Sequence, residues 1–122
     1  MDKDKLIAVI GVSENPGKFG YKIFTDLLSA GLKVVAVGIR GGIVAGKTVY
    51  TSLKDLPNKP DIVLTVVPPE CTNKTVDEII SLGIKEVWMQ PGSVSQEAVK
   101  KAKLAGVKVT DHGCFMVTCG IW

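Results

Sequence analysis

The fold is decided by residues 6–20, LIAVIGVSENPGKFG. The apolar run Leu6–Ile10 closes on Gly11 and gives way to a loop of small and polar residues. An amphipathic segment, Tyr21–Ala30, follows at once. A buried strand, a small-residue loop and then a helix is the arrangement by which α/β proteins present backbone N–H groups to a phosphate. The segment therefore predicts a strand–loop–helix unit that holds a nucleotide-like ligand.

Strands and helices alternate along the rest of the chain. Apolar, β-branched runs predict strands over residues 6–11, 33–38, 48–50, 61–67, 86–89 and 107–110. Helical spacing predicts helices over residues 21–30, 52–56, 75–82 and 95–105, with a loop over residues 41–46. Such alternation implies right-handed βαβ crossovers, and the continuous apolar strands imply helices on both faces. The predicted fold is α/β, a doubly wound parallel sheet of Rossmann-like, three-layer αβα type. We expect the first strand at its centre and residues 61–67 beside it across the switch point.

Composition limits the classes of protein that the chain can represent. Its 122 residues suit one domain, residues 1–122, with 46% hydrophobic and 22% charged residues. A net charge of +3 without a basic cluster argues against nucleic acid as a partner. No apolar stretch approaches the roughly 18 residues that a membrane span needs. Three cysteines without a disulfide or zinc spacing indicate reduced thiols, so we expect a cytoplasmic protein without a membrane partner.

Turn-forming residues gather where the predicted strands end. They lie in the segments Val12–Phe19, Ile39–Gly42, Pro68–Glu70 and Gln90–Ser93. Parallel strands bring all four segments to one edge of the sheet, where open α/β sheets bind ligands. The first helix directs its positive N-terminal end to the same place. We therefore expect a ligand crevice at this edge.

The first loop matches neither of the common phosphate-loop motifs. Five residues separate Gly11 from the Gly17-Lys18 pair, where a Walker A loop has four, and Phe19 stands where Ser or Thr would bind magnesium. The glycines at positions 11, 17 and 20 do not fit G-x-G-x-x-G either. A plain strand-to-helix turn is the alternative to a phosphate loop.

The only arginine, Arg40, follows the second predicted strand. NAD sites usually have an acidic residue there to bind the ribose hydroxyls, but this chain has Gly38 and Ile39 before Arg40. A guanidinium suits a phosphate on the ribose, which favours NADP or coenzyme A (CoA) over NAD. A solvated surface arginine explains the residue equally well. The segment Val67–Pro69 either offers a purine an apolar ledge or simply ends its strand.

Several motifs together resemble the single-domain CoA-binding proteins. In order they are VIGVSENPGKFGYKI, GKTVYTSLKDLP, VPPE and VWMQPGSVSQEAVKKAKLAGVKV, so that the resemblance runs from Leu6 to about Met116. The chain also resembles the N-terminal, CoA-binding domain of succinyl-CoA synthetase alpha subunits, especially at VPPE and over residues 38–46. It departs from the family at Ile39-Arg40, where Asn-Pro is common, and in its last residues, VTCGIW.

The resemblance implies a site for CoA. The backbone of Gly11–Ser13 and Lys18 would hold the phosphates, and the adenosine would lie between the turn Gly38–Arg40 and the ledge Val67–Pro68. The segment Gln90–Gly92 would lie beside the pantetheine, and Arg40 is a candidate for the 3′-phosphate. The residues expected to bind the ligand are Gly11, Val12, Ser13, Pro16, Lys18, Phe19, Gly20, Tyr21, Gly38, Ile39, Arg40, Val67, Pro68, Pro69, Gln90, Pro91 and Gly92.

Nothing in the sequence predicts catalysis by this chain itself. Succinyl-CoA synthetase works through a phosphorylated histidine of a second domain, and His112, the only histidine here, matches no such motif. No Ser/His/Asp, paired-carboxylate or metal-ligand spacing is present. Cys114, which matches the family's cysteine near the C-terminus, has two interpretations. It is a small buried apolar residue, or it forms a mixed disulfide with the CoA thiol.

The sequence thus predicts a protein that binds CoA or an acyl-CoA by its nucleotide–diphosphate end. The alternatives are an NADP- or NAD-binding redox-sensing module, a non-catalytic subunit of an acyl-CoA ligase, and a structural domain without a ligand. A second copy of the chain and a ligase partner chain are both open as protein partners.

Overall fold

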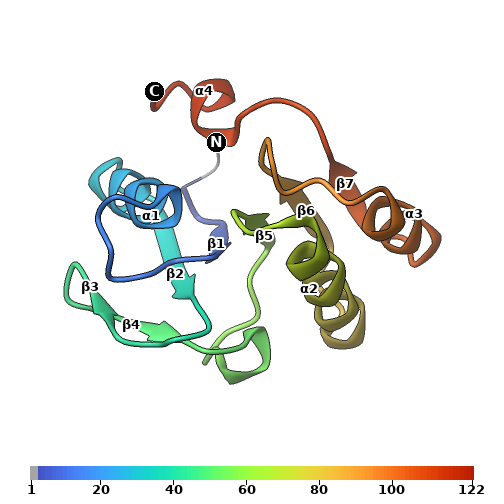
Figure 1. Cartoon of the computed structure of the whole chain (residues 1–122), viewed down its shortest axis with the longest axis horizontal. Coiled ribbons are helices and arrows are strands. Elements are labelled where there is room, and N and C mark those ends of the chain that lie inside the picture. The colour runs from blue at the N-terminus through green and yellow to red at the C-terminus, as the bar shows by residue number, and fades with distance from the viewer. Residues whose placement is uncertain (1–2) are drawn as a thin grey trace.

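The computed structural model describes residues 3–122 and contains one sheet of seven strands, in the order β3-β4-β2-β1-β5-β6-β7 (Figure 1). All neighbouring strands are parallel except β3 and β4, which are antiparallel. The elements in chain order are β1 (Leu6–Ile10), α1 (Phe19–Ser29), β2 (Lys33–Val37), β3 (Ile43–Val44), β4 (Lys47–Tyr50), the 3-10 turn η1 (Leu53–Asp55), β5 (Ile62–Thr65), α2 (Pro69–Leu82), β6 (Glu86–Met89), α3 (Gln96–Leu104), β7 (Lys108–Thr110) and α4 (Phe115–Thr118).

The centre of the sheet is β1, as predicted. It pairs with β2 on one side and β5 on the other, so that Ile10 lies opposite both Val37 and Thr65. The strand order reverses between these two neighbours, which is where α/β sheets bind ligands. The loops that follow β1, β2, β5 and β6 therefore reach the same edge, which we call the carboxyl edge.

Helices cover both faces of the sheet, which confirms the three-layer fold. Helices α1 and α4 pack on one face in a core that includes Phe24, Leu27 and Phe115. Helices α2 and α3 and the turn η1 pack on the other face, where Ile79 and Val99 are buried. Figure 1 shows α2 and α3 together on the side of the sheet away from α1. Within residues 3–122, no helix has both the length and the apolar character to cross a membrane.

Three elements begin or end two or more residues away from the predicted bounds, and one predicted loop contains a strand. Residues 41–46 form β3 and the turn of a hairpin with β4, because Ala45 (φ 52°) and Gly46 (φ 75°) adopt the paired positive φ of a tight hairpin turn. Helix α1 begins at Phe19 instead of residue 21, and α2 at Pro69 instead of residue 75. Strand β5 ends at Thr65, two residues before the predicted end. Proline is compatible with the first position of a helix, so Pro69 begins α2 as well as following the strand.

The C-terminal segment forms a short helix that the sequence did not predict. Helix α4 places Phe115, 2% exposed, against the core of α1, and the Phe115 ring meets Trp88 edge-on at 5.2 Å between centroids. The Trp122 indole N–H then donates a hydrogen bond to the Asp26 carboxylate of α1, 2.8 Å away. The segment thus covers sheet surface that α1 alone leaves open, and Figure 1 shows it crossing from β7 toward α1.

Candidate functional site

Three glycines bring the loops of the carboxyl edge into backbone contact. A Cβ atom on Gly20 would lie 2.0 Å from the Gly11 carbonyl oxygen, and one on Gly38 would lie 1.9 Å from the Val12 carbonyl oxygen. A Cβ on Gly11 would lie 2.2 Å from the carbonyl oxygen of Val66, at the end of β5. No other residue type fits these positions without moving the backbone. The loop after β1 is therefore fixed against α1, the end of β2 and the residue that follows β5.

Hydrogen bonds within the loop after β1 hold its shape. The Asn15 N–H donates to Ser13 Oγ at 3.2 Å, and Asn15 Oδ1 accepts from the Gly17 N–H at 2.9 Å. Helix α1 begins just beyond, with neither a side-chain cap nor an acidic residue in its first turn. No capping side chain and no acidic residue of its first turn thus offsets the partial positive charge of its N-terminus. The arrangement suits an anion.

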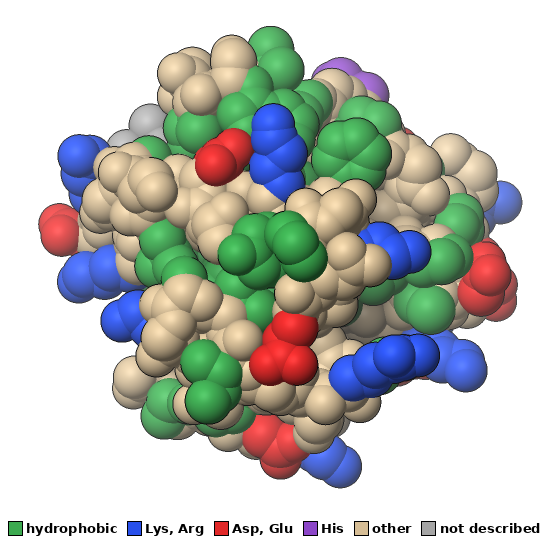
Figure 2. All heavy atoms as spheres, turned by 60° about the vertical axis from the view of Figure 1, so that its left-hand side comes forward, with side chains coloured by type: hydrophobic (Ala, Val, Ile, Leu, Met, Phe, Trp, Pro, Cys, Tyr) green, Lys and Arg blue, Asp and Glu red, His purple; other side chains and the backbone are tan. Residues whose placement is uncertain are grey.

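Two cationic side chains lie at this edge. Lys18 precedes α1 and is exposed, and Arg40 is exposed in the turn that follows β2. That turn is closed by the Gly41 N–H, which donates to the Gly38 carbonyl oxygen at 3.0 Å, and it presents Ile39 with 91% of its surface exposed. Within the described residues 3–122, neither cation has an ion pair. Figure 2 shows Lys and Arg side chains scattered among acidic and apolar ones over the face it presents.

An acidic side chain, Glu14, lies beside the turn that follows β2, although no acidic residue follows β2 in the sequence. The Glu14 carboxylate crosses from the loop after β1 and accepts a hydrogen bond from the Ile43 N–H at 3.0 Å. It also lies against Gly42, where a Cβ atom would be 2.8 Å from Glu14 Oε2. Glu14 and Ile43 are 29 positions apart in the chain, so no sequence motif predicted their contact.

The predicted purine ledge lies next to the same loop. Val67 is half-buried, and a Cβ on Gly11 would come within 2.8 Å of Val67 Cγ1. Pro68 and Pro69 are exposed, and Pro69 begins α2. An apolar surface therefore borders the backbone that we expect to hold the phosphates.

The Gln90 side chain is hydrogen-bonded to the C-terminal segment of the protein. It is 5% exposed; its Oε1 accepts from the Phe115 N–H at 2.7 Å, and its Nε2 donates to Cys114 Sγ at 3.4 Å. Pro91 and Gly92, which follow it, are exposed. The contacts of Gln90 thus anchor the C-terminal segment to the end of β6, a role that sequence reasoning missed.

The predicted site residues differ in how far they are open to solvent. Phe19 is 68% exposed, and its ring centre lies 6.5 Å from that of Trp122. The exposed members are Pro16, Lys18, Phe19, Ile39, Arg40, Pro68, Pro69, Pro91 and Gly92; those of intermediate exposure are Gly11, Ser13, Tyr21 and Val67; the buried ones are Val12, Gly20, Gly38 and Gln90. The loop after β1 contacts both the turn after β2 and the residues after β5, and Gln90, at the start of the fourth predicted loop, is tied to the C-terminal segment.

Cys114 and Cys119 flank α4 and differ in acidity. Burial raises the pKa of the Cys114 thiol, but hydrogen bonds from Gln90 and from the backbone of Val117 and Met116 outweigh it, and the net pKa is lowered. Burial raises the pKa of Cys119, and the neighbouring Cys114 raises it further. A thiol with a lowered pKa forms its thiolate at lower pH, and the thiolate is the reactive species.

We therefore expect Cys114 to be alkylated before Cys119. In a Cys71→Ser background, which removes the exposed cysteine, iodoacetamide should modify Cys114 several-fold faster at neutral pH. The pH at which the alkylation rate of Cys114 is half-maximal should lie below the ordinary pKa of a cysteine thiol. The corresponding pH for Cys119 should lie above it. Peptide mass spectrometry over a pH series measures both. Faster modification of Cys119, or a higher midpoint for Cys114, contradicts the assignment.

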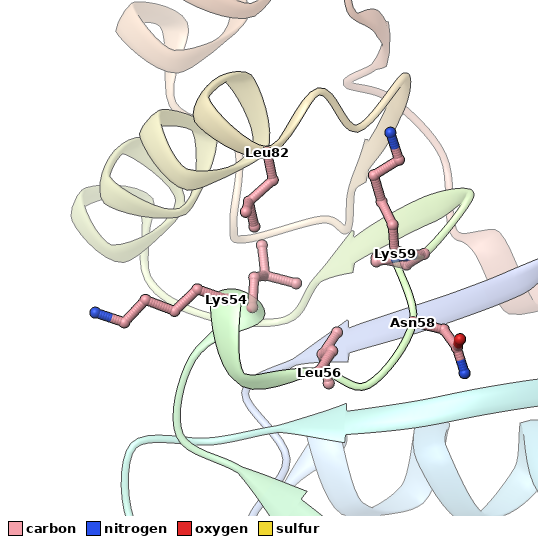
Figure 3. Close-up of a pocket in the computed structure, with 7 residues that line it drawn as sticks. Lys54, Leu56, Asn58, Lys59 and Leu82 are labelled. Carbon is pink, nitrogen blue, oxygen red and sulfur yellow. The ribbon is translucent and has the colours of Figure 1, made fainter.

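The hollows near α2 are a different part of the surface. One of about 110 Å³ is lined by η1, the residues that precede β5 and the end of α2, with Lys54, Leu56 and Leu82 around it (Figure 3). A second, of about 250 Å³, runs along α2 past Asp77 and Glu78. Ligand pockets usually measure roughly 300 Å³ or more. Neither hollow is lined by a predicted site residue, so neither coincides with the site expected at the carboxyl edge.

Comparison with known proteins gives relatives over nearly the whole chain. A family model described as CoA binding domain matches residues 5–120. The alpha subunit of acetate–CoA ligase [ADP-forming] I from Pyrococcus furiosus is 32% identical in an alignment of 129 positions, which covers 93% of this chain and 28% of that protein. The chain therefore spans less than a third of the length of that ligase subunit.

Solved structures show the same fold. A conserved hypothetical protein from Pyrococcus furiosus superposes with a TM-score of 0.88 and 36% identity, over 93% of this chain and 98% of that one. The dinucleotide forming acetyl-coenzyme A synthetase 1 of Ca. Korarchaeum cryptofilum, in complex with phosphate and ADP, matches with a TM-score of 0.75 and 27% identity. That match covers 86% of this chain and 25% of the synthetase. By fold, by sequence and by the order of its motifs, the chain belongs to the CoA binding domain family.

Proposed function

We propose that the protein binds CoA or an acyl-CoA by its nucleotide–diphosphate end at the carboxyl edge, and that it performs no chemistry of its own. One observation carries the proposal. In a member of the CoA binding domain family, a loop fixed by three glycines adjoins a helix N-terminus that has no capping side chain and no acidic residue. Such an end attracts a phosphate through its N–H groups and its dipole.

The proposed ligand extends over the four loops. The diphosphate lies at the backbone of Gly11–Ser13, where the Lys18 ammonium offsets its charge. The adenosine lies between the turn Gly38–Arg40 and the apolar ledge Val67–Pro69, and the pantetheine passes Gln90–Gly92. Tyr21, one turn into α1 and half-buried, borders the diphosphate. Residues 1–122 act as a single CoA-binding domain in a cytoplasmic protein.

Isothermal titration with CoA, NADP and NAD tests the proposal. We expect saturable one-to-one binding of CoA, with NADP and NAD much weaker. Binding of NADP without binding of CoA would instead identify the redox-sensing alternative. Mass spectrometry of small molecules released from the heat-denatured protein would then identify any ligand that is carried through purification.

Arg40 is the proposed partner of the 3′-phosphate, which leads to a specific prediction. A charge-assisted hydrogen bond contributes about 1.5–3 kcal/mol, so Arg40→Ala should weaken CoA binding about 10- to 100-fold. Binding of 3′-dephospho-CoA should change little, since it lacks the group that Arg40 contacts. Lys47→Ala, which removes a cation from the β3–β4 hairpin, is the matched control. Equal affinities of the wild type for CoA and 3′-dephospho-CoA would remove Arg40 from this role.

A second candidate function is that of a non-catalytic subunit in an acyl-CoA ligase. Two curated relatives from Pyrococcus furiosus are alpha subunits of ADP-forming acetate–CoA ligases, and this chain spans 28% and 26% of their lengths. A chain of this kind would supply CoA to a partner that carries the remaining domains. Co-purification with a separate ligase subunit from the source cell, with CoA-dependent ligase activity in the complex, would support this function.

A further inference from the structure

We propose that the Glu14 carboxylate occupies, in the free protein, the place that the 3′-phosphate of the ligand takes on binding. This inference rests on the proposed function and adds a residue that sets affinity at the same site. Glu14 is thus an internal competitor, and ligand binding requires its carboxylate to leave.

The position of Glu14 is the first observation. Its backbone lies in the loop that we expect to bind the diphosphate, yet its carboxylate reaches the Ile43 N–H, 3.0 Å away on the β3 side of the edge. The carboxylate lies so close to Gly42 that a Cβ atom there would be 2.7 Å from Glu14 Cδ. A carboxylate is therefore already hydrogen-bonded to the backbone of this segment, beside Gly42.

The shape and charge of the segment suit a phosphate as well as a carboxylate. Gly41 (φ 63°) and Gly42 (φ 104°) are consecutive residues of positive φ, a conformation that glycine adopts readily, and the Ile43 N–H that follows them already donates to an anionic partner. Arg40 precedes them directly, and no ion pair within residues 3–122 engages its guanidinium. Among the described residues, Glu14 has a hydrogen bond only from the Ile43 N–H, and Arg40 is not paired with it. A phosphate in the same place would accept from the Ile43 N–H, and its larger charge would draw the Arg40 side chain, two residues before Gly42, toward it.

Glu14 and a phosphate cannot share the place without repulsion. Like charges a few ångströms apart at a protein surface repel, and the effect weakens as salt shortens the screening length from about 10 Å at 0.1 M to about 3 Å at 1 M. Glu14 is exposed and held by a single hydrogen bond, so its displacement into solvent is feasible. The carboxylate therefore lowers the affinity for ligands with a 3′-phosphate and leaves that for dephosphorylated ones nearly unchanged.

Glu14→Gln separates charge from structure, because glutamine keeps an oxygen that accepts from the Ile43 N–H. We expect this variant to bind CoA about tenfold more tightly than the wild type at low salt, and to bind 3′-dephospho-CoA with less than about a twofold change. The gain should shrink in about 1 M salt. The control is Glu86→Gln, which removes the same charge at the start of β6, where Glu86 pairs with Lys108 at 3.8 Å.

Isothermal titration distinguishes the outcomes. Absence of CoA binding to the wild type would overturn the proposed function itself. Binding of CoA by the wild type without a gain in Glu14→Gln would overturn only the competitor role. An equal increase in the affinity of Glu14→Gln for CoA and for 3′-dephospho-CoA would place the repulsion at the diphosphate. It would contradict a 3′-phosphate site at the Ile43 N–H. In the unaltered protein, the amide NMR signal of Ile43 should move with CoA and stay nearly fixed with 3′-dephospho-CoA.

Discussion

Gly38→Ala is expected to destabilise the protein by about 3 kcal/mol and to abolish CoA binding at concentrations that saturate the wild type. The added Cβ would stand 1.9 Å from the Val12 carbonyl oxygen and 3.2 Å from Val49 Cγ1. Gly38 does not have a positive φ, so alanine tolerates its backbone angles and only the lack of space opposes the change. Relief requires the loop after β1 to move away from the end of β2. The same movement would separate the phosphate-binding backbone from the Arg40 turn.

Gly17→Ala is the matched control for this prediction. Gly17 lies in the same region without a positive φ, and the nearest atom to its added Cβ is Asn15 Oδ1 at 3.2 Å, the end of a side chain. We expect a change in unfolding free energy within about 1 kcal/mol. Urea denaturation followed by circular dichroism measures both variants. A Gly38→Ala protein as stable as Gly17→Ala would show that the close backbone contact does not constrain the edge.

Phe115→Ala is expected to lower the unfolding free energy by about 3–5 kcal/mol, the usual cost of emptying a buried phenylalanine site. The side chain is 2% exposed and packs edge-on against Trp88. Its loss would also loosen α4, whose N-terminal residue donates to Gln90 Oε1 at 2.7 Å. The C-terminal segment would then no longer cover the sheet face beside α1. Chemical denaturation, with tryptophan fluorescence as the readout, measures the effect.

Val117→Ala, in the same helix, provides the comparison. Val117 is 60% exposed, so its truncation removes little buried surface and should cost no more than about 0.5 kcal/mol. Alanine favours a helix slightly more than phenylalanine or valine does, and this effect is small beside the packing energy lost in Phe115→Ala. Similar small effects of both substitutions would mean that α4 is not part of the core.

The sequence predicted the sheet well because its signals are local. Runs such as Leu6–Ile10 and Lys33–Val37 are continuous and β-branched, which is typical of strands buried on both faces. The central place of β1, with β5 beside it, was expected from the strand order of doubly wound sheets. The start of α2 was wrong because Pro68 and Pro69 end a strand and begin a helix with equal ease. Helix α4, with four residues, is too short to show a helical period.

The candidate site divides in the same way. Gly11, Gly20 and Gly38 were predicted from loops at strand ends, and each proves to be a position where backbone meets backbone. The contacts of Glu14 with Ile43 and of Gln90 with Phe115 join residues 29 and 25 positions apart. Such contacts depend on the three-dimensional arrangement of loops far apart in the sequence, and no spacing of residues in the sequence predicts them.

The most direct test is a titration of the isotope-labelled protein with CoA, followed by amide NMR. We expect the signals of Gly11–Ser13, Lys18 and Gly38–Arg40 to shift and saturate together, while those of Lys54 and Lys59, beside the hollow near α2, stay in place. Unchanged signals along the carboxyl edge at millimolar CoA, or shifts confined to the hollow near α2, would contradict a CoA site at the carboxyl edge.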